Sequence, residues 1–261
     1  MNTGFPRSPA SDTLFPSSVV PAIAGAGLRI APGVAAAVAT SARSAMKTAS
    51  VRMRRGYRYA RGMWDGLTTR LEGRVVTVEP LAVDHEPGLY AAAQDMDWSL
   101  MPIDPSGDAG RFHRWLEDAL ALAERGEQFP FAVLDAKTGE PLGSTRYLSL
   151  RPEHRGLEIG WTWLTRQAWG TGANIEAKLL LLTRAFEHLG CMRVEFKTDA
   201  TNERSRRALA ALPAEFEGVS RKHMLAGNDG TRLRDSAWYA IVDTDWPAVK
   251  SNLEQRLMPM R

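Results

Sequence analysis

A short segment with two glycines is the part of this sequence whose residue types and spacing best fit a chemical task. It covers residues 166–173 and contains Gly170 and Gly172. Glycine lets successive backbone N–H groups point at one place, and the N-terminus of a following helix adds partial positive charge. The segment joins a predicted strand ending at Leu164 to a predicted helix beginning near Asn174. It is therefore suited to binding a pyrophosphate.

Two better-known phosphate-binding motifs do not fit this segment. A dinucleotide fingerprint needs a third glycine and a later acidic residue for the ribose, and both are missing. A P-loop ends in Gly-Lys followed by Ser or Thr, which is missing too. On this feature alone, an ordinary turn between a strand and a helix stays open as the alternative.

The other reactive side chains carry less weight. The single cysteine, Cys191, rules out an intrachain disulfide and has no histidine beside it, so we expect a small buried residue and not a nucleophile. With five histidines and one cysteine, no spacing fits a zinc site, and we expect no bound metal. His154 is expected on the surface, whereas His223 could face either a bound substrate or solvent. Three tryptophans could either form the floor of a substrate pocket or belong to the core, namely Trp98, Trp161 and Trp163.

The elements that must position the loop follow from the hydrophobic periodicity of the chain. Predicted strands lie at 75–78, 131–135, 142–150, 156–164, 192–198, 215–225 and 233–242. Predicted helices lie at 83–94, 108–125, 174–189 and 202–212. Asp108 is expected to cap the second helix and Gly190 to end the third. This order predicts an α/β (α+β) fold in which a mixed sheet carries helices on both faces.

The charge of the chain is distributed unevenly. Nine of the 33 basic residues but only one of the 30 acidic residues, Asp12, fall in residues 1–64. Residues 65–261 therefore contain 24 basic and 29 acidic residues, a net charge of −5, although the whole chain has +3. We expect the folded part to favour a cationic substrate and to bind no specific nucleic acid.

Residues 1–64 are predicted to be a basic N-terminal extension, disordered or partly helical, and residues 65–261 to be the folded domain. Proline and glycine interrupt the start of the extension, and a basic helix could form at 34–63. The extension could tether the chain to a membrane or nucleic acid, act as a targeting segment, or be upstream sequence from a mis-assigned start. No apolar run approaches the roughly 20 residues that span a bilayer. We therefore expect no transmembrane segment. The single cysteine, which allows no intrachain disulfide, makes a reducing, cytoplasmic setting the default expectation.

Four ordered pieces of sequence together resemble the GNAT superfamily of N-acetyltransferases. Gln167, Gly170 and Gly172 are spaced as in the pyrophosphate loop of that family. The other three pieces are residues 158–164, 193–199 and 202–205. These three pieces resemble the branch that includes the ribosomal-protein alanine acetyltransferases.

The resemblance implies an acyl-CoA N-acyltransferase fold over about 71–245. Its mostly antiparallel sheet of six to seven strands would be split into a V between the strands 157–164 and 192–198, and the pantetheine arm of acetyl-CoA would enter the V. The backbone of 163–165 would bind the pantetheine amides, and residues 167–173 would wrap the pyrophosphate. The residues that the resemblance assigns to acetyl-CoA are Trp163, Leu164, Thr165, Gln167, Gly170, Thr171, Gly172, Ala173, Asn174, Asn202 and Ser205.

The chemistry that the resemblance implies is direct attack of a neutral amine on the acetyl carbonyl in a ternary complex. Glu158 is the candidate base, with an exposed or salt-bridged carboxylate as the alternative. Ser205 is the candidate acid for the leaving thiolate, because 203–212 lacks the tyrosine that many members place there. A plain first-turn helix residue is the alternative for Ser205. The acceptor would be a protein N-terminus or a small amine, and a homodimer is a family expectation.

Two other classes of function remain open. The missing tyrosine fits an acyl-CoA-binding module without catalysis. The basic extension fits a nucleic-acid or membrane adaptor, for which deletion of residues 1–64 would abolish function. Pro213 is a further departure from the family, which usually has glycine after this helix, because proline is not expected to adopt the left-handed cap.

Overall fold

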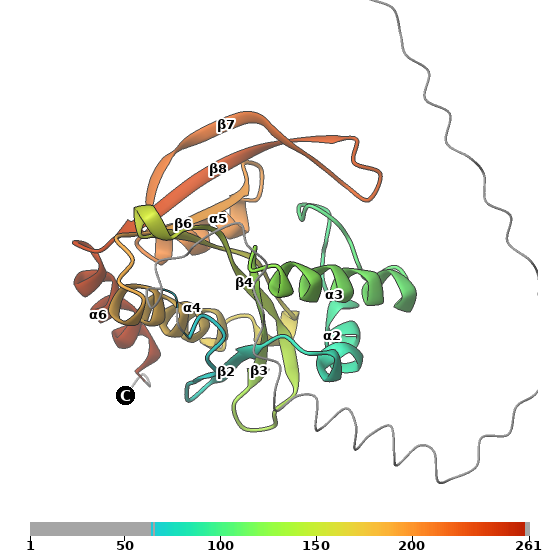
Figure 1. Ribbon diagram of the computed structural model, residues 1–261, viewed down its shortest axis with the longest axis horizontal. Coiled ribbons are helices and arrows are strands. Elements are labelled where there is room, and N and C mark those ends of the chain that lie inside the picture. Colours follow the sequence, from blue (N-terminus) through green and yellow to red (C-terminus); the bar gives the residue numbers. More distant parts are fainter. Residues whose placement is uncertain (1–63, 65, 259–261) are drawn as a thin grey trace, which may run out of the picture. The chain divides into compact units, whose positions relative to one another are not determined.

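The fold is an open sheet of eight strands, shown in a computed structural model that describes Trp64 and residues 66–258 (Figure 1). The predictions for the basic extension at 1–64 therefore fall almost wholly outside the described residues. The strand order is β1-β2-β3-β4-β5-β6-β8-β7, and every pair is antiparallel except β5 with β6. The strands are β1 (Leu71–Glu72), β2 (Val76–Pro80), β3 (Phe129–Asp135), β4 (Pro141–Arg151), β5 (Gly156–Leu164), β6 (Arg193–Asp199), β7 (Glu215–Ala226) and β8 (Arg232–Val242).

The sheet has one strand more than the six to seven that were expected. The additional strand, β1, has only two residues, which is too short for any alternation of polar and apolar residues to be recognised. The other seven strands coincide with the predicted ones to within a few residues at each end.

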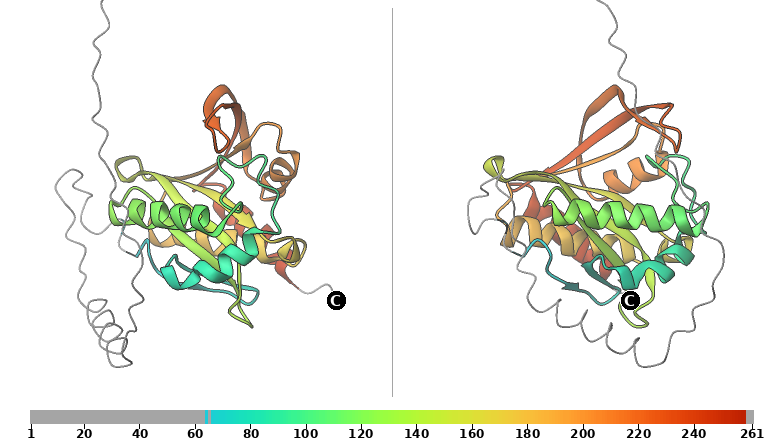
Figure 2. Two further views of the ribbon diagram at one scale, coloured as in Figure 1. Left: turned by 90° about the vertical axis from the view of Figure 1, so that its right-hand side faces the viewer. Right: turned by 45° about the vertical axis from the view of Figure 1, so that its right-hand side comes forward.

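Helices cover both faces of the sheet, as predicted (Figures 1 and 2). On one face, α2 (Glu86–Ala93) and α3 (Ala109–Glu124) pack Leu89, Phe112 and Trp115 against Leu134 of β3. On the other face, α4 (Ala173–Thr183) and α6 (Trp246–Leu257) form a larger core with the sheet. A π-helical turn, η4 (Arg184–His188), continues α4, and α5 (Glu203–Ala211) follows β6. Three short 3₁₀ segments are η1 (Val83–His85), η2 (Pro152–His154) and η3 (Arg166–Ala168).

The V in the sheet comes from strands β5 and β6, which pair only over their first residues. The pairs are Gly156 with Arg193, Leu157 with Val194, and Glu158 with Glu195. Beyond Glu158, the two strands diverge. Thr145 of β4 faces two residues of β5, Trp161 and Thr162, and Trp161 has a φ of 52°. Such a β-bulge bends its strand and thus turns β5 away from β6.

The N-terminus of α4 is fixed by the buried carboxylate of Glu176. Its two oxygens accept hydrogen bonds from the backbone N–H groups of Arg74 at 2.9 Å, Val75 at 2.6 Å and Val76 at 2.7 Å. A Cβ atom on Gly73 would lie 2.4 Å from this carboxylate, so only glycine fits there. The start of β2 and the start of α4 are thereby held together.

The turn after α5 differs from the sequence-based expectation. Pro213 has a φ of 25°, and the N–H of Ala214 donates to the carbonyl of Leu209 at 3.2 Å. The expectation that proline excludes a positive φ at this position was therefore wrong. Because the pyrrolidine ring favours a φ near −65°, the turn is strained.

Candidate active site

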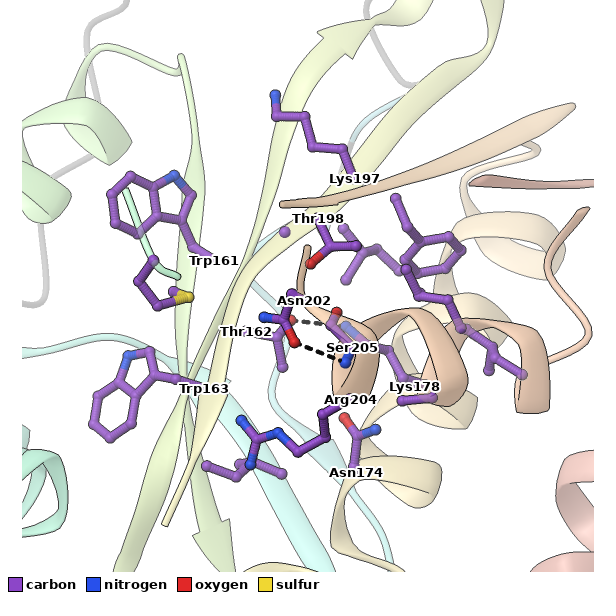
Figure 3. A pocket seen from close by; sticks show the side chains of 18 of the residues that line it. Trp161, Thr162, Trp163, Asn174, Lys178, Lys197, Thr198, Asn202, Arg204 and Ser205 are labelled. Carbon is purple, nitrogen blue, oxygen red and sulfur yellow. Dashed lines mark hydrogen bonds between the residues drawn. The ribbon is translucent and has the colours of Figure 1, made fainter. Parts of the chain in front are cut away.

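A cavity of about 430 Å³ occupies the V, where β5, β6, α4 and α5 meet. Figure 3 shows the walls of this cavity, with Trp161 and Trp163 on strand β5, and with Asn174, Arg204 and Ser205 on helices across from it. Seven of the predicted site residues line the cavity, namely Glu158, Trp163, Leu164, Gly170, Asn174, Asn202 and Ser205. The V therefore brings the predicted base, the glycine loop and the start of α5 to one place.

The glycine loop contributes Trp169 and Gly170 to the lining of the cavity. Gly170 and Gly172 have φ values of 76° and 91°, which glycine adopts without strain, and Gly172 is the N-cap of α4. Thr171 stabilises the loop, because its hydroxyl donates to the carbonyl of Ala168 at 2.8 Å. The predicted residues that do not line the cavity are Thr165, Gln167, Thr171, Gly172 and Ala173.

The end of β5 departs in part from the expectation that its backbone faces the cleft. The N–H of Thr165 donates to the carbonyl of Leu142 at 2.8 Å, so this amide binds β4 and not a pantetheine. The carbonyl of Leu164 accepts a hydrogen bond from the indole of Trp169 at 3.0 Å. Successive residues of a strand direct their backbone groups to opposite neighbours, so not all of 163–165 can face the cavity.

Glu158 is almost fully buried, at 1% exposure, at the point where β5 and β6 begin to diverge. Its Oε2 accepts hydrogen bonds from Nζ of Lys197 at 3.1 Å and from the hydroxyl of Ser149 at 3.1 Å. Its Oε1 lies toward Gly160, beside the bulge at Trp161. The carboxylate is thus both part of the cavity wall and the salt-bridged group that the sequence left open as the alternative.

Asn202 and Ser205 act together at the start of α5. The side-chain oxygen of Asn202 accepts a hydrogen bond from the N–H of Ser205 at 2.9 Å, which is an N-cap (Figure 3). Both residues also line the cavity. The capping role and the site role are therefore compatible.

Lys178 is a cavity residue that the sequence analysis missed. It lies on α4 at 6% exposure, and its Nζ donates to the hydroxyl of Thr162 at 2.8 Å. Thr162 in turn shares a hydrogen bond of 2.8 Å with Thr145. Burial lowers the pKa of Lys178 to about 7. A lysine three residues after Ile175 and four before Leu182, within the apolar stripe of the helix, was the signal that could have revealed it.

Two arginines lie close to Trp169, which lines the cavity. The guanidinium of Arg204 lies 3.8 Å from the centre of the Trp169 ring, and that of Arg166 lies 5.5 Å from it. Arg256 of α6 lines the cavity as well and donates a hydrogen bond to the carbonyl of Ala211. The sequence analysis assigned a role to none of these arginines.

The charged side chains that line the cavity are mostly basic. They are Lys178, Lys197, Arg204, Arg234 and Arg256, against Asp97 and Glu158. The net negative charge of residues 65–261 led us to expect a cationic substrate. The lining of this cavity is instead mostly basic, so the net charge of the domain does not describe the cavity.

The cysteine and the two histidines considered as candidates do not line the cavity. Cys191 is buried at 2% exposure, and burial raises its pKa to about 12, which confirms the expectation of an unreactive core residue. His154 is exposed, as expected. His223 lies 3.0 Å from the hydroxyl of Ser236, and burial together with Lys197 lowers its pKa.

The three tryptophans divide between the core and the cavity. Trp98 and Trp163 have ring centres 5.2 Å apart in the core beneath α3. Trp161 lines the cavity, and the guanidinium of Arg146 lies 4.9 Å from the centre of its ring. Trp163 also lines the cavity, but it is only 2% exposed, whereas Trp161 is half-buried and has the side chain that is best placed of the three to meet a ligand.

Two kinds of feature are absent from the described part of the chain. Among Trp64 and residues 66–258, no three His, Cys, Asp or Glu side chains are grouped so as to hold a metal ion. In the same residues, no helix is both long and apolar enough to cross a membrane.

Comparison with known proteins agrees with the fold. A family model described as an acetyltransferase (GNAT) domain matches residues 76–214, which is more than half of the chain. A search of curated protein sequences finds no match. A GCN5-related N-acetyltransferase from Brucella melitensis is 30% identical, covering 74% of this chain and 86% of its own, with a TM-score of 0.68.

Further solved structures have the same fold. A T. thermophilus protein described as an acetyltransferase is 40% identical over 72% of this chain and 97% of its own, with a TM-score of 0.64. RimJ of Mycobacterium smegmatis, in complex with CoA-disulfide, is 20% identical over 72% of this chain and 92% of its own, with a TM-score of 0.57. The split sheet, the matched family model and the similarity to these proteins show that the chain belongs to the GNAT acetyltransferase family, with its acyl-CoA N-acyltransferase fold.

Proposed function

We propose that this chain is an acetyl-CoA-dependent N-acetyltransferase that transfers acetyl to a primary amine by direct attack in a ternary complex. The observation that carries the proposal is the cavity in the V, which is lined at one place by the N-terminus of α4 and at another by the buried carboxylate of Glu158. The first suits a pyrophosphate, and the second suits a proton transfer.

The residues present fit acetyl-CoA. Next to Gly170, a space of 4 Å is free of other atoms where a Cβ would be, so a phosphate can approach the backbone closely. Arg204, which lies over Trp169 of the loop, adds positive charge that complements the phosphates, and Arg256 adds a further positive charge to the lining of the cavity. Apolar side chains line the cavity along α4, α5 and α6 and can contact the pantetheine arm; they are Ile175, Ala208, Leu209, Leu212 and Leu253.

The proton transfers can be assigned to two residues of the cavity. Glu158 would accept a proton from the incoming amine at Oε1, because both of its hydrogen bonds are made by Oε2. Ser205, at the start of α5, would approach the sulfur and supply a proton to the leaving thiolate. Backbone N–H groups of β5 near the bulge, where β5 no longer pairs with β6, would stabilise the negative charge that develops on the carbonyl oxygen of the thioester.

Titration calorimetry with acetyl-CoA tests the cofactor assignment. We expect micromolar binding by the full chain and at least about tenfold weaker binding by Asn174→Glu, since a carboxylate in the first turn of α4 repels the pyrophosphate but suits the helix dipole. Asn252→Glu on the exposed face of α6 is the matched control and should bind like the wild type. Absence of binding by the folded wild type would contradict the proposal.

A second candidate is an acyl-CoA-binding module without catalysis. It is favoured by the ion pair that already occupies Glu158 and by the lack of tyrosine in α5. Release of CoA thiol in the presence of peptide N-termini and small amines separates the two functions. Binding without release for every acceptor would favour the module. The homodimer stays a prediction, which sedimentation can test.

A further inference from the structure

Arg234 of β8 is a buried arginine that lines the cavity without a direct partner. It is 5% exposed, and its Nε is buried without a hydrogen bond. Among residues 66–258, its guanidinium makes no ion pair either. Leaving a buried charge unpaired is costly, so such groups are normally matched by an opposite charge.

The two carboxylates that interact electrostatically with Arg234, those of Asp199 and Glu158, already accept hydrogen bonds from other donors. Asp199 accepts hydrogen bonds from Nη1 of Arg232 at 2.7 Å and from the hydroxyl of Thr201 at 2.7 Å. Glu158 accepts from Lys197. Both acids interact with Arg234 only over a longer range, and burial lowers the pKa of Arg234 despite them. The guanidinium fork is therefore available to an anion that comes from outside the chain.

Arg234 lies on the sheet face away from the expected acetyl-CoA side. Side chains alternate along a strand, and Ile159, Phe196 and Ala237 belong to the core under α4. Their neighbours Glu158 and Lys197 point to the opposite face. In β8, Ser236 precedes Ala237 and therefore also points to that opposite face, where its hydroxyl lies beside His223. Arg234, two residues before Ser236, points the same way. An acceptor that meets Glu158 and Arg234 therefore approaches from this face.

We infer that the acceptor is a small amine that carries a carboxylate, as a free amino acid does, and that Arg234 binds this carboxylate. The inference rests on the proposed acetyl transfer and specifies its substrate. The planar guanidinium matches a carboxylate with two parallel hydrogen bonds. With its carboxylate on Arg234, the amine nitrogen is directed toward Glu158.

The carboxylate of the acceptor takes no part in the bonds that form and break during the transfer. The amine nitrogen forms the new C–N bond to the acetyl carbon, and the C–S bond breaks with its electron pair on sulfur. Glu158 takes one proton from the nitrogen, and the thiolate receives one proton from Ser205 or water. The products are an N-acetyl amino acid and CoA. Apolar residues at this end fit an apolar side chain, namely Leu100, Met101, Pro102, Leu148 and Met224.

Two matched pools of acceptors test the inference on the full wild-type chain. One pool holds the standard amino acids and the other holds their carboxamides, which keep the amine but lack the carboxylate. With acetyl-CoA present, mass spectrometry of the acetylated products should show transfer to the acids at least about thirtyfold faster than to the amides, the loss expected when a buried charge loses its partner. Equal or faster transfer to the amides, or transfer to neither pool, would overturn the inference.

Variants of Arg234 complete the test. Arg234→Met should abolish the preference for the acids, and Arg234→Lys should restore only part of it, because lysine lacks the fork. Arg221→Met removes the same charge from an exposed site on the neighbouring strand and should keep the preference. Titration of each variant with acetyl-CoA separates the two proposals. Wild type that binds acetyl-CoA but ignores the carboxylate sinks only the substrate assignment, whereas wild type that does not bind acetyl-CoA sinks the acetyltransferase proposal with it.

Discussion

At the scale of single residues, Lys178 is held in an environment that disfavours its charge. It is buried on α4, its ammonium contacts the hydroxyl of Thr162, and no carboxylate among residues 66–258 pairs with it. Lysine normally stays charged to about 10.5, whereas burial lowers the pKa of Lys178 to about 7. Its proton is therefore bound more tightly in the unfolded chain than in the folded one.

Lys178→Met is expected to stabilise the protein near neutral pH. Between about 7 and 10.5, the unfolded state binds more protons at this site than the folded state, so wild-type stability rises with pH through that window. The gain from methionine should thus be largest at and below pH 7 and should shrink toward pH 10. Urea denaturation of both proteins at several pH values measures this difference. An advantage that stays constant with pH would contradict the assignment.

Glu158→Gln is expected to lower kcat/KM for acetyl transfer by about 10²–10⁴-fold, the usual loss for a general base. The KM for acetyl-CoA should change little, because Glu158 lies on the face away from α4. Steady-state kinetics with a thiol reagent for CoA provides the measurement. Glu153→Gln, an exposed carboxylate of η2, is the control. Activity retained within a few-fold would remove Glu158 from the mechanism.

At the scale of secondary structure, the position of the α4 N-terminus depends on one carboxylate. Glu176 joins the helix to three backbone N–H groups at the start of β2, across about a hundred residues of chain. Charged hydrogen bonds of this kind are stronger than neutral ones, and each N–H would be left unsatisfied without it. The start of α4, where we propose that the pyrophosphate binds, is thus held in place by β2.

Glu176→Gln is expected to reduce the free energy of unfolding by roughly 2–4 kcal/mol. Affinity for acetyl-CoA should also weaken, because the helix N-terminus would shift relative to Gly170. Urea denaturation and calorimetry give the two values. Glu254→Gln, at an exposed position of α6, should change neither. Unchanged stability in the first variant would show that the three hydrogen bonds contribute little.

At the scale of the whole molecule, the local charge of the cavity differs from the charge of the domain. The residues from 65 onward have more acids than bases, yet the cavity has a basic lining. An anionic ligand such as acetyl-CoA is therefore attracted only close to the cavity. Salt screens such interactions over distances of about 10 Å at 0.1 M.

Binding of acetyl-CoA is accordingly expected to weaken with ionic strength. We expect Kd to rise roughly tenfold between about 50 and 500 mM NaCl, as the basic residues that line the cavity are screened. Calorimetry at several salt concentrations measures it, with unfolding in urea over the same range as a control for stability. A Kd independent of salt would mean that apolar contacts dominate binding.

Much of the fold could be predicted from the sequence because it depends on neighbours along the chain. The glycine loop between β5 and α4 depends on the backbone freedom of Gly170 and Gly172. The caps at Asp108 and Asn202 depend on side chains that reach the N–H three residues ahead. Alternation and helical periodicity likewise place seven strands and four helices. These are local preferences, which the sequence by itself determines.

The tertiary structure alone decided which charges meet in the cavity. Glu158 and Lys197 lie 39 residues apart, and their contact depends on the register of β5 with β6. Arg234 faces the cavity because β8 pairs with β6. Helix α6 closes the opposite side of the cavity, and the periodicity of the sequence did not lead us to predict it. Strand register and helix packing come from the combined burial of many distant side chains. No local pattern encodes them, so the acceptor end of the site is visible only in the folded chain.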